Sequence, residues 1–477
     1  MLFNSFEFLL FFPAVTLLYF LLPHAWRWLL LLAASCLFYM VFIPKYILIL
    51  LATIVVDYAA GILIEGTAPG KLRKLYLVVS LVVTVSILAF FKYFNFLNDN
   101  IASVARFLHW NYGVASLKII LPIGLSFHTF QSMSYVIEVY RGNQKAERHF
   151  GIYALYVMFY PQLVAGPIER PQNLLHQFRE PHAFDYDRVT GGLKRMALGL
   201  FKKLVIADSL GIFVDQVFNN LHEYTGYPLL LAGMCFSYQI YCDFSGYSDI
   251  ALGAAQVMGF RLMENFDRPF AARSVADFWR RWHKSLTSWF RDYVYIPLGG
   301  NRAGAVRRSA NLFATFLLSG LWHGANWTYV LWGSLNGLYL VLSSPTATLR
   351  ERVARFAGLD SRPRLQQALQ MATTFLLVSI AFLLFRANSM DDAAYIFSHL
   401  LDDFTGGSKR GRLAFDGFLV VFILFLEYVQ YLYRAGGMSN LFIGRPVLVR
   451  WSLYYALITI TILFGSYGEQ KFIYFQF

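Results

Sequence analysis

Charged side chains are scarce in this sequence. Only 14% of the 477 residues are Asp, Glu, Lys or Arg, whereas 57% are hydrophobic and 18% are aromatic. A soluble protein carries about 25% charged residues, and one large core cannot account for a mean hydropathy of +0.48, because a soluble chain still needs a polar shell. The composition excludes a secreted soluble domain, a nucleic-acid-binding domain and a disordered chain. It predicts a membrane protein.

Cysteines and acidic residues are also few. The three cysteines, Cys36, Cys235 and Cys242, lack the paired spacing of a metal site and indicate no disulfide framework. We therefore expect no metal. The 28 acidic residues are outnumbered by 41 Lys and Arg, which gives a net charge of +13. In a multi-pass membrane protein such an excess is typical of cytoplasmic loops, so we expect no nucleic-acid partner.

Apolar runs that approach the length needed to cross a bilayer recur along the whole chain. The first run lacks the basic residues and the cleavage site of a signal peptide, so we expect it to stay attached. An all-α, multi-pass membrane protein with about ten to twelve membrane helices is predicted, as a single domain over residues 1–477. The runs lie at roughly 3–22, 27–43, 46–64, 75–92, 116–137, 150–166, 196–218, 228–256, 309–342, 367–386, 414–433 and 450–467.

Several of these runs are interrupted by proline, glycine or charged residues. Pro161–Gly166 bends one run, and Asp243 and Asp249 place two carboxylates in another. Such segments are tolerated at membrane depth only where protein or a water-filled cavity surrounds them. We expect Gln162 to line a cavity. Asp243 would anchor an arginine such as Arg281, which is the role we favour, or orient a histidine.

Cations and aromatic residues are interleaved in the segment 261–308. On a helix, Phe278, Trp282, Leu286, Trp289 and Tyr293 would form one apolar stripe with most cations off it. This pattern is typical of a basic amphipathic helix at the membrane surface, where it would contact lipid headgroups or the phosphates of a nucleotide-based donor. The residues expected to hold such a donor are Arg281, Trp282, Lys284 and Arg291.

Two histidines are candidates for chemistry. His283 lies on the apolar side of the expected helix, where a histidine is more often structural than catalytic. His323 lies about 14 residues into the run at 309–342, or about 21 Å along a helix, and an ionisable group at such depth by default marks a functional site. A histidine there is suited to taking a proton from a hydroxyl or thiol. Gly320 and Gly324 would leave room for a ligand or permit close helix packing.

The segments around both histidines resemble the membrane-bound O-acyltransferases. The resemblance is carried by Asp277–Arg302 and Gly320–Trp327, and it extends to Tyr241–Asp249, Glu264–Pro269, Pro161–Pro167 and Phe472–Phe477. The chain is most similar to the bacterial branch that modifies polysaccharides. This resemblance implies a helical bundle around a transmembrane tunnel, with re-entrant or interfacial helices in addition, in the bacterial inner membrane.

The resemblance also implies an activity and its residues. His323 matches the catalytic histidine of the family, and His283 matches a histidine at the mouth or wall of the tunnel, so both are candidate catalytic residues. Trp322 lies next to His323 in the same motif, and Asn326 or nearby backbone N–H groups would stabilise an oxyanion. The implied reaction moves an acetyl group from acetyl-CoA, as co-substrate, to an exported polysaccharide such as alginate, cellulose or peptidoglycan. A separate periplasmic SGNH-hydrolase-like protein would be the partner.

Alternatives to this reaction stay open at the level of sequence. A related branch transfers D-alanine to teichoic acid from a carrier protein. An acyl-enzyme could form on His323 during the transfer. A polysaccharide or lipid transporter would use His323 as a proton relay, although the sequence lacks the internal repeats with paired broken helices that are typical of transporters.

Overall fold

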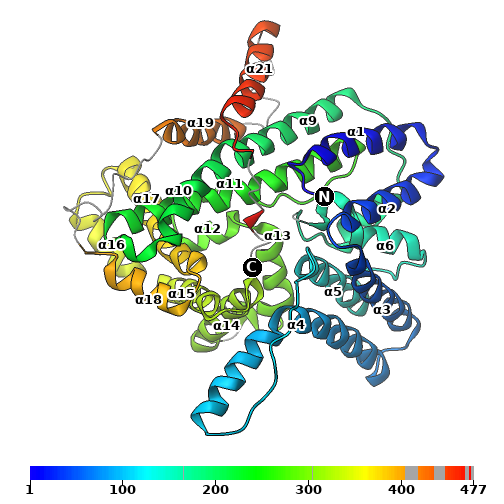
Figure 1. The fold of residues 1–477 in the computed structure, drawn as a ribbon, viewed down its shortest axis with the longest axis horizontal. Coiled ribbons are helices and arrows are strands. Elements are labelled where there is room, and N and C mark those ends of the chain that lie inside the picture. The colour runs from blue at the N-terminus through cyan, green and yellow to red at the C-terminus, as the bar shows by residue number, and fades with distance from the viewer. Residues whose placement is uncertain (165, 303, 403–416, 435–445, 468–471, 474–477) are drawn as a thin grey trace. The chain divides into compact units, whose positions relative to one another are not determined.

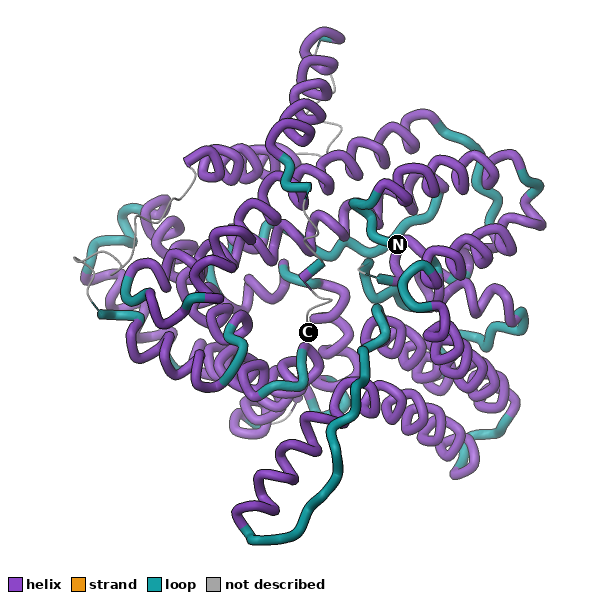
Figure 2. The backbone as a smooth tube through the Cα atoms, in the orientation of Figure 1, coloured by secondary structure: helices purple, strands orange, loops and turns teal. Residues whose placement is uncertain are grey.

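The computed structural model describes the chain except for residues 165, 303, 403–416, 435–445, 468–471 and 474–477. All regular secondary structure in the described residues is helical (Figures 1 and 2). The all-α prediction is confirmed. Two units are present, one with Met1–Ala197 and Tyr247–Met263 and the other with Leu198–Gly246 and Glu264–Phe477; we call them unit 1 and unit 2. A single domain over 1–477 stays a prediction.

Unit 1 is built mainly from the helices that come first in the chain. Asp57, in the middle of α3, is buried, and its carboxylate accepts hydrogen bonds from Ser80 Oγ at 2.5 Å and Thr84 Oγ1 at 3.1 Å. Polar contacts of this kind join helices where no water competes, and they fix α3 against α4. The helices are α1 (Phe6–Leu21), α2 (His24–Met40), α3 (Ile47–Gly66), α4 (Lys71–Phe107), α5 (Leu125–Arg141), α6 (Phe150–Met158), α7 (Tyr160–Leu163), α8 (Pro171–Leu174) and most of α9 (Tyr186–Leu200).

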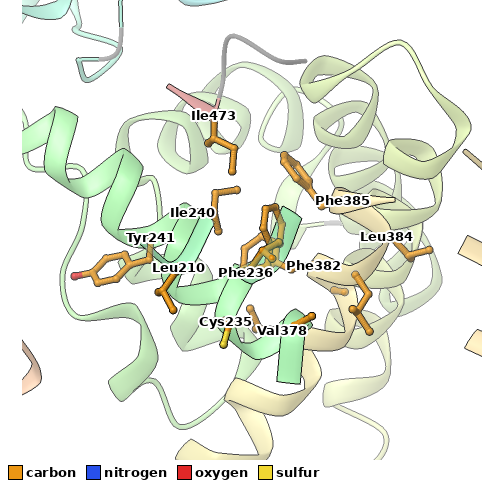
Figure 3. Packing of buried hydrophobic residues seen from close by; sticks show 14 of the residues in the cluster. Leu210, Cys235, Phe236, Ile240, Tyr241, Val378, Phe382, Leu384, Phe385 and Ile473 are labelled. Atoms are coloured by element: carbon orange, nitrogen blue, oxygen red, sulfur yellow. The ribbon is translucent and has the colours of Figure 1, made fainter. Parts of the chain in front are cut away.

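Unit 2 contains the segments around both candidate histidines. Its core packs α11 residues such as Phe236 and Ile240 with Val378 and Phe382 of α17 (Figure 3). A π-helical stretch, Phe201–Ala207, follows α9. The helices are α10 (Asp208–Asn219), the first part of α11 (Tyr227–Met258), α12 (Val275–Arg281), α13 (Lys284–Phe290), α14 (Ala305–His323), α15 (Trp327–Ser343), α16 (Ala347–Phe356), α17 (Pro363–Arg386), α18 (Met390–His399), α19 (Gly417–Arg434) and α21 (Val447–Phe464).

Four helical stretches in the described residues are long and apolar enough to cross a membrane, judged by length and composition. They are Pro44–Gly66, Lys71–Phe107, Pro363–Arg386 and Val447–Phe464. Other predicted runs form shorter helices, because α1 has 16 residues and α2 and α15 have 17. The number of membrane helices therefore stays a prediction, while the multi-pass character agrees with these four helices.

Candidate active site

His323 lies at the tip of a helical hairpin in unit 2. It is the last residue of α14, and α15 begins four residues later at Trp327. Gly324 is extended, and the Oδ1 atom of Asn326 caps α15 by accepting the N–H of Thr328 at 3.1 Å. The interpretation of 309–342 as one continuous run is therefore wrong. An extended glycine followed by an N-cap asparagine ends one helix and starts the next.

The glycines beside His323 serve close packing of the two hairpin helices. A Cβ atom on Gly320 would overlap the carbonyl oxygen of Tyr329 and would lie 3.1 Å from the Cα of Gly333. A Cβ atom on Gly324 would overlap the ring of Tyr329. Of the two readings that the sequence left open, room for a ligand and close packing, the geometry favours close packing.

Replacing Gly320 with alanine is expected to separate α14 from α15. The added methyl group meets backbone atoms, which cannot move aside as a flexible side chain can, and overpacking of this kind costs about 1–3 kcal/mol. We expect a lower thermal midpoint in detergent, together with a displacement of His323. Gly304→Ala is the matched control, since nothing lies within 4 Å of a Cβ atom at that glycine. Equal midpoints for the two variants would contradict this packing role.

His283 lies at a break between two short helices. The stripe from Phe278 to Tyr293 predicted one amphipathic helix, but α12 ends at Arg281 and α13 begins at Lys284. His283 itself has a φ of 42°, a left-handed conformation that is costly for a residue with a Cβ atom. Asn265 holds the break, because its carbonyl accepts the N–H of Lys284 at 2.8 Å and its Oδ1 accepts the Ser285 hydroxyl at 2.8 Å.

The apolar stripe faces the protein and not a membrane surface. Phe278 and Trp282 belong to the buried cluster of unit 2, and Leu286 and Trp289 are buried as well. The surface-helix interpretation is therefore corrected. The burial that the spacing predicted for His283 is confirmed, since only 1% of the residue is exposed.

Both candidate histidines contact the same tryptophan. The ring centroid of Trp322 lies 4.8 Å from that of His323 and 6.3 Å from that of His283. His323 also meets Trp332 at 5.0 Å and Phe385 at 5.3 Å, both nearly edge-on. The structure thus brings the two histidines together in one aromatic environment, in which 6% of His323 is exposed.

The residues that were expected to bind the donor are buried to different degrees. Trp282 is buried, Arg281 and Lys284 are half-buried, and Arg291 is exposed and pairs with Asp292 at 2.8 Å. Arg281 pairs with Asp277 at 3.1 Å. Burial raises the pKa of Asp277, but the hydrogen bonds from Arg281 and the Arg273 backbone outweigh this effect and lower the pKa below its usual value. Asp277 therefore stays ionised near neutral pH and holds Arg281.

Three further predicted site residues have structural partners. Asn326 Nδ2 donates to the carbonyl of Asn388 at 3.1 Å, so its amide is engaged at both ends. Asp243 pairs with Lys203 at 2.7 Å and not with an arginine. Gln162 lies in unit 1, where it is buried and donates to the carbonyl of Tyr156 at 2.7 Å. In the described part of the chain, no group of three or more His, Cys, Asp or Glu side chains is arranged to hold a metal ion.

Sequence reasoning missed Lys203 and the aromatic partners of His323. Lys203 stands in the predicted membrane run at 196–218, so the rule that marked His323 also applied to it. No comparable signal exists for Trp332 and Phe385, because an aromatic residue in an apolar helix is ordinary core. Only the packing of α15 and α17 places them on the imidazole ring.

Comparison with known proteins gives a consistent set of relatives. Residues 149–385 match MBOAT, the membrane-bound O-acyltransferase family. The probable alginate O-acetylase AlgI of Pseudomonas aeruginosa is 40% identical over 396 residues, which cover 82% of this chain and 73% of that protein. The peptidoglycan O-acetyltransferase of Helicobacter pylori is 33% identical over 407 residues, covering 80% and 74%. The teichoic acid D-alanyltransferase of Streptococcus thermophilus is 30% identical over 283 residues, covering 55% and 68%. The range 149–385 contains both His283 and His323.

Proposed function

Because the chain belongs to the membrane-bound O-acyltransferase family, we propose that it transfers an acetyl group from acetyl-CoA across the membrane for the O-acetylation of an exported polysaccharide. The similarity to alginate and peptidoglycan O-acetylating proteins extends over about four fifths of the chain, which supports a polysaccharide acceptor. The similarity to the D-alanyltransferase covers 55% of the chain and is lower in identity, which favours acetyl over D-alanyl transfer. A transporter is set aside because the chain is a membrane-bound acyltransferase.

His323 is the general base of the proposed reaction. The acceptor hydroxyl attacks the carbonyl carbon of the thioester while the imidazole takes its proton, and the C–S bond then breaks. The proton passes to the CoA thiolate as it leaves. General bases contribute about 10²–10⁴-fold to such steps. The observation that carries the proposal is the meeting of the buried His323 and His283 on the ring of Trp322.

Exclusion of water protects the thioester before transfer. Since 6% of His323 is exposed, a donor reaches the imidazole only when rings such as those of Trp322 and Phe385 move aside. The CoA phosphates would bind outside this shell, at cations such as Arg281, Lys284 and Arg291. The engaged amide of Asn326 weighs against it as the oxyanion donor and favours backbone N–H groups near Gly324.

The membrane context determines where donor and acceptor lie. Acetyl-CoA is cytoplasmic, whereas the polymer is exported, so the acetyl group has to cross the bilayer through a tunnel past His323. The proposal places the chain in the bacterial inner membrane. It includes a separate periplasmic SGNH-type protein that passes the acetyl group to the polymer.

A donor experiment tests the proposed reaction. Membrane vesicles from cells that make the chain and their polymer are supplied with radiolabelled acetyl-CoA or with a radiolabelled D-alanyl carrier protein, and base-labile label on the polymer is counted. We expect label from acetyl-CoA alone, and none in vesicles that lack the chain. Label that comes only from the carrier protein would refute the acetyl assignment and support the D-alanyl alternative.

A further inference from the structure

A buried ion cluster in unit 2 links Lys203 and Asp208 to Asp243 and, through Asp243, to the backbone of Ile473. The Nζ atom of Lys203 lies 2.7 Å from Asp208 Oδ1 and 2.7 Å from Asp243 Oδ1, and all three side chains are at most 4% exposed. The second carboxylate oxygen of Asp243 accepts the backbone N–H of Ile473 at 2.7 Å. Asp243 thus fixes the Phe472–Ile473 segment to α11 across 230 positions of sequence.

The approach of the lysine to Asp243 depends on a glycine on the same face of α11. A Cβ atom on Gly246 would lie 2.8 Å from the carbonyl oxygen of Gly199 and 3.2 Å from the amide nitrogen of Lys203. The π-helical stretch that carries Lys203 therefore packs directly against α11. A buried charge-assisted hydrogen bond is stronger than one between neutral groups, so the ion cluster is a firm anchor for Ile473.

The anchored segment packs on a side chain that contacts His283. Phe472 is fully buried, and its ring lies 5.8 Å from that of Phe244. Phe244 in turn lies 4.6 Å from the ring of His283, at an interplanar angle of 85°. Asp243 and Phe244 are successive residues of α11. Asp243 holds the backbone of the Phe472–Ile473 segment, and the ring of Phe244 lies between Phe472 and His283.

The neighbouring residue of the segment belongs to the main buried cluster of unit 2. Ile473 belongs to the same buried cluster as Trp332 and Phe385, whose rings contact His323, and it lies close to Ile240 of α11 (Figure 3). Neither Phe472 nor Ile473 carries a group that takes part in acyl transfer. Their contact with the reaction is through the rings that they pack against.

We propose that Asp243 and Phe472 are positioning residues for the active site. Asp243 holds the Phe472–Ile473 segment, Phe472 fixes the ring of Phe244, and Phe244 fixes the imidazole of His283 beside Trp322. The expected effect of these residues on the rate of acetyl transfer rests on the proposed function. Their expected effect on the position of His283 does not depend on which substrate the protein uses. Removal of Phe472 leaves Phe244 free to rotate and His283 without a fixed neighbour.

The first test compares Phe472→Ala with Tyr467→Ala, an exposed aromatic residue from the same part of the chain. For Phe472→Ala we expect kcat for acetyl transfer to fall by up to about 100-fold, the cost of a misplacement of about 1 Å in an active site. We expect KM for acetyl-CoA to stay within about three-fold of wild type. Tyr467→Ala should retain wild-type values. If Phe472→Ala does not accumulate in membranes, Phe472→Leu replaces it. Unchanged kcat in a folded Phe472 variant would overturn the proposal.

The second test does not require a substrate. The purified protein is treated with diethyl pyrocarbonate, and carbethoxylation of His283 is followed by mass spectrometry. We expect His283 to react slowly in the wild type and faster in Phe472→Ala and Asp243→Ala. Tyr467→Ala should react at the wild-type rate, since the Tyr467 side chain is exposed. Equal rates in all variants would overturn the proposal. A wild type that transfers no acetyl group but shows these rate differences would refute the proposed function alone.

Discussion

Replacing His323 with alanine is expected to lower the rate of acetyl transfer about 1,000-fold, the middle of the range for a lost general base. The alanine variant keeps α14, since alanine has the highest helix propensity. It removes the imidazole whose ring contacts Trp322, Trp332 and Phe385. Donor binding at the cations of α12 and α13 should be unchanged, so the loss should appear in kcat and not in KM.

The measurement for His323 is ester-linked acetate on the exported polymer, together with the amount of polymer and the amount of protein in the membrane. His176→Ala is the matched control, since the side chain of His176 is 57% exposed and lies in unit 1. Unchanged acetate in His323→Ala would remove the assignment of His323 as the base. Loss of acetate together with loss of polymer export would instead support a transport role.

Replacing Lys203 with methionine is expected to give the largest loss of stability. Methionine keeps the length of the side chain but removes the charge, and it leaves the carboxylates of Asp208 and Asp243 buried without that cation. Removing one partner of a buried ion pair typically costs about 3–5 kcal/mol. We expect a much lower thermal midpoint in detergent, followed through tryptophan fluorescence, and poor accumulation in membranes.

Two further variants serve as controls for the Lys203→Met experiment. Arg280→Met removes a cation whose side chain is 73% exposed and whose partner lies 3.5 Å away, so its cost should be at most about 1 kcal/mol. The triple variant Lys203→Met, Asp208→Asn, Asp243→Asn removes the charges from the cluster and should recover much of the stability. A midpoint for Lys203→Met equal to that of Arg280→Met would show that the cluster is not a stabilising feature.

Both candidate histidines could be predicted because burial of a residue can be inferred from the hydrophobic residues near it in the sequence. His323 was found because a titratable residue in an apolar run is rare, and His283 was predicted to be buried because Trp279 and Leu286 share its row at helical spacing. The single helix expected there was nevertheless wrong, since the break at His283 is held by hydrogen bonds that Asn265 accepts from Lys284 and Ser285. Periodicity within a segment contains no information about a loop that packs on it.

The partners of the predicted residues were harder to predict than the residues themselves. The apolar surroundings of Asp243 indicate that it needs a cation, but they do not indicate which one. Lys203 supplies the cation from 40 residues away, and the backbone N–H of Ile473 supplies a second contact from 230 residues away. From the sequence, Gly324 fits ligand space or close helix packing, and Asn326 is one of two candidate oxyanion donors, whereas in the structure they end α14 and begin α15. The same residue types serve helix termini and chemistry, and local sequence does not separate the two uses.

The length of α4 has a consequence for how unit 1 sits in a bilayer. Its 37 residues span about 56 Å, nearly twice the roughly 30 Å of hydrocarbon. Even when inclined by 40°, the steep end of the known range, the helix would cover about 42 Å along the bilayer normal and leave about 12 Å among headgroups or in water. Since cations such as Lys71 and Arg73 are typical of cytoplasmic ends, we expect its first turn on the cytoplasmic side. In that orientation its last turns, after Asn98, would emerge on the opposite side, where the proposed acceptor of the acetyl group would lie.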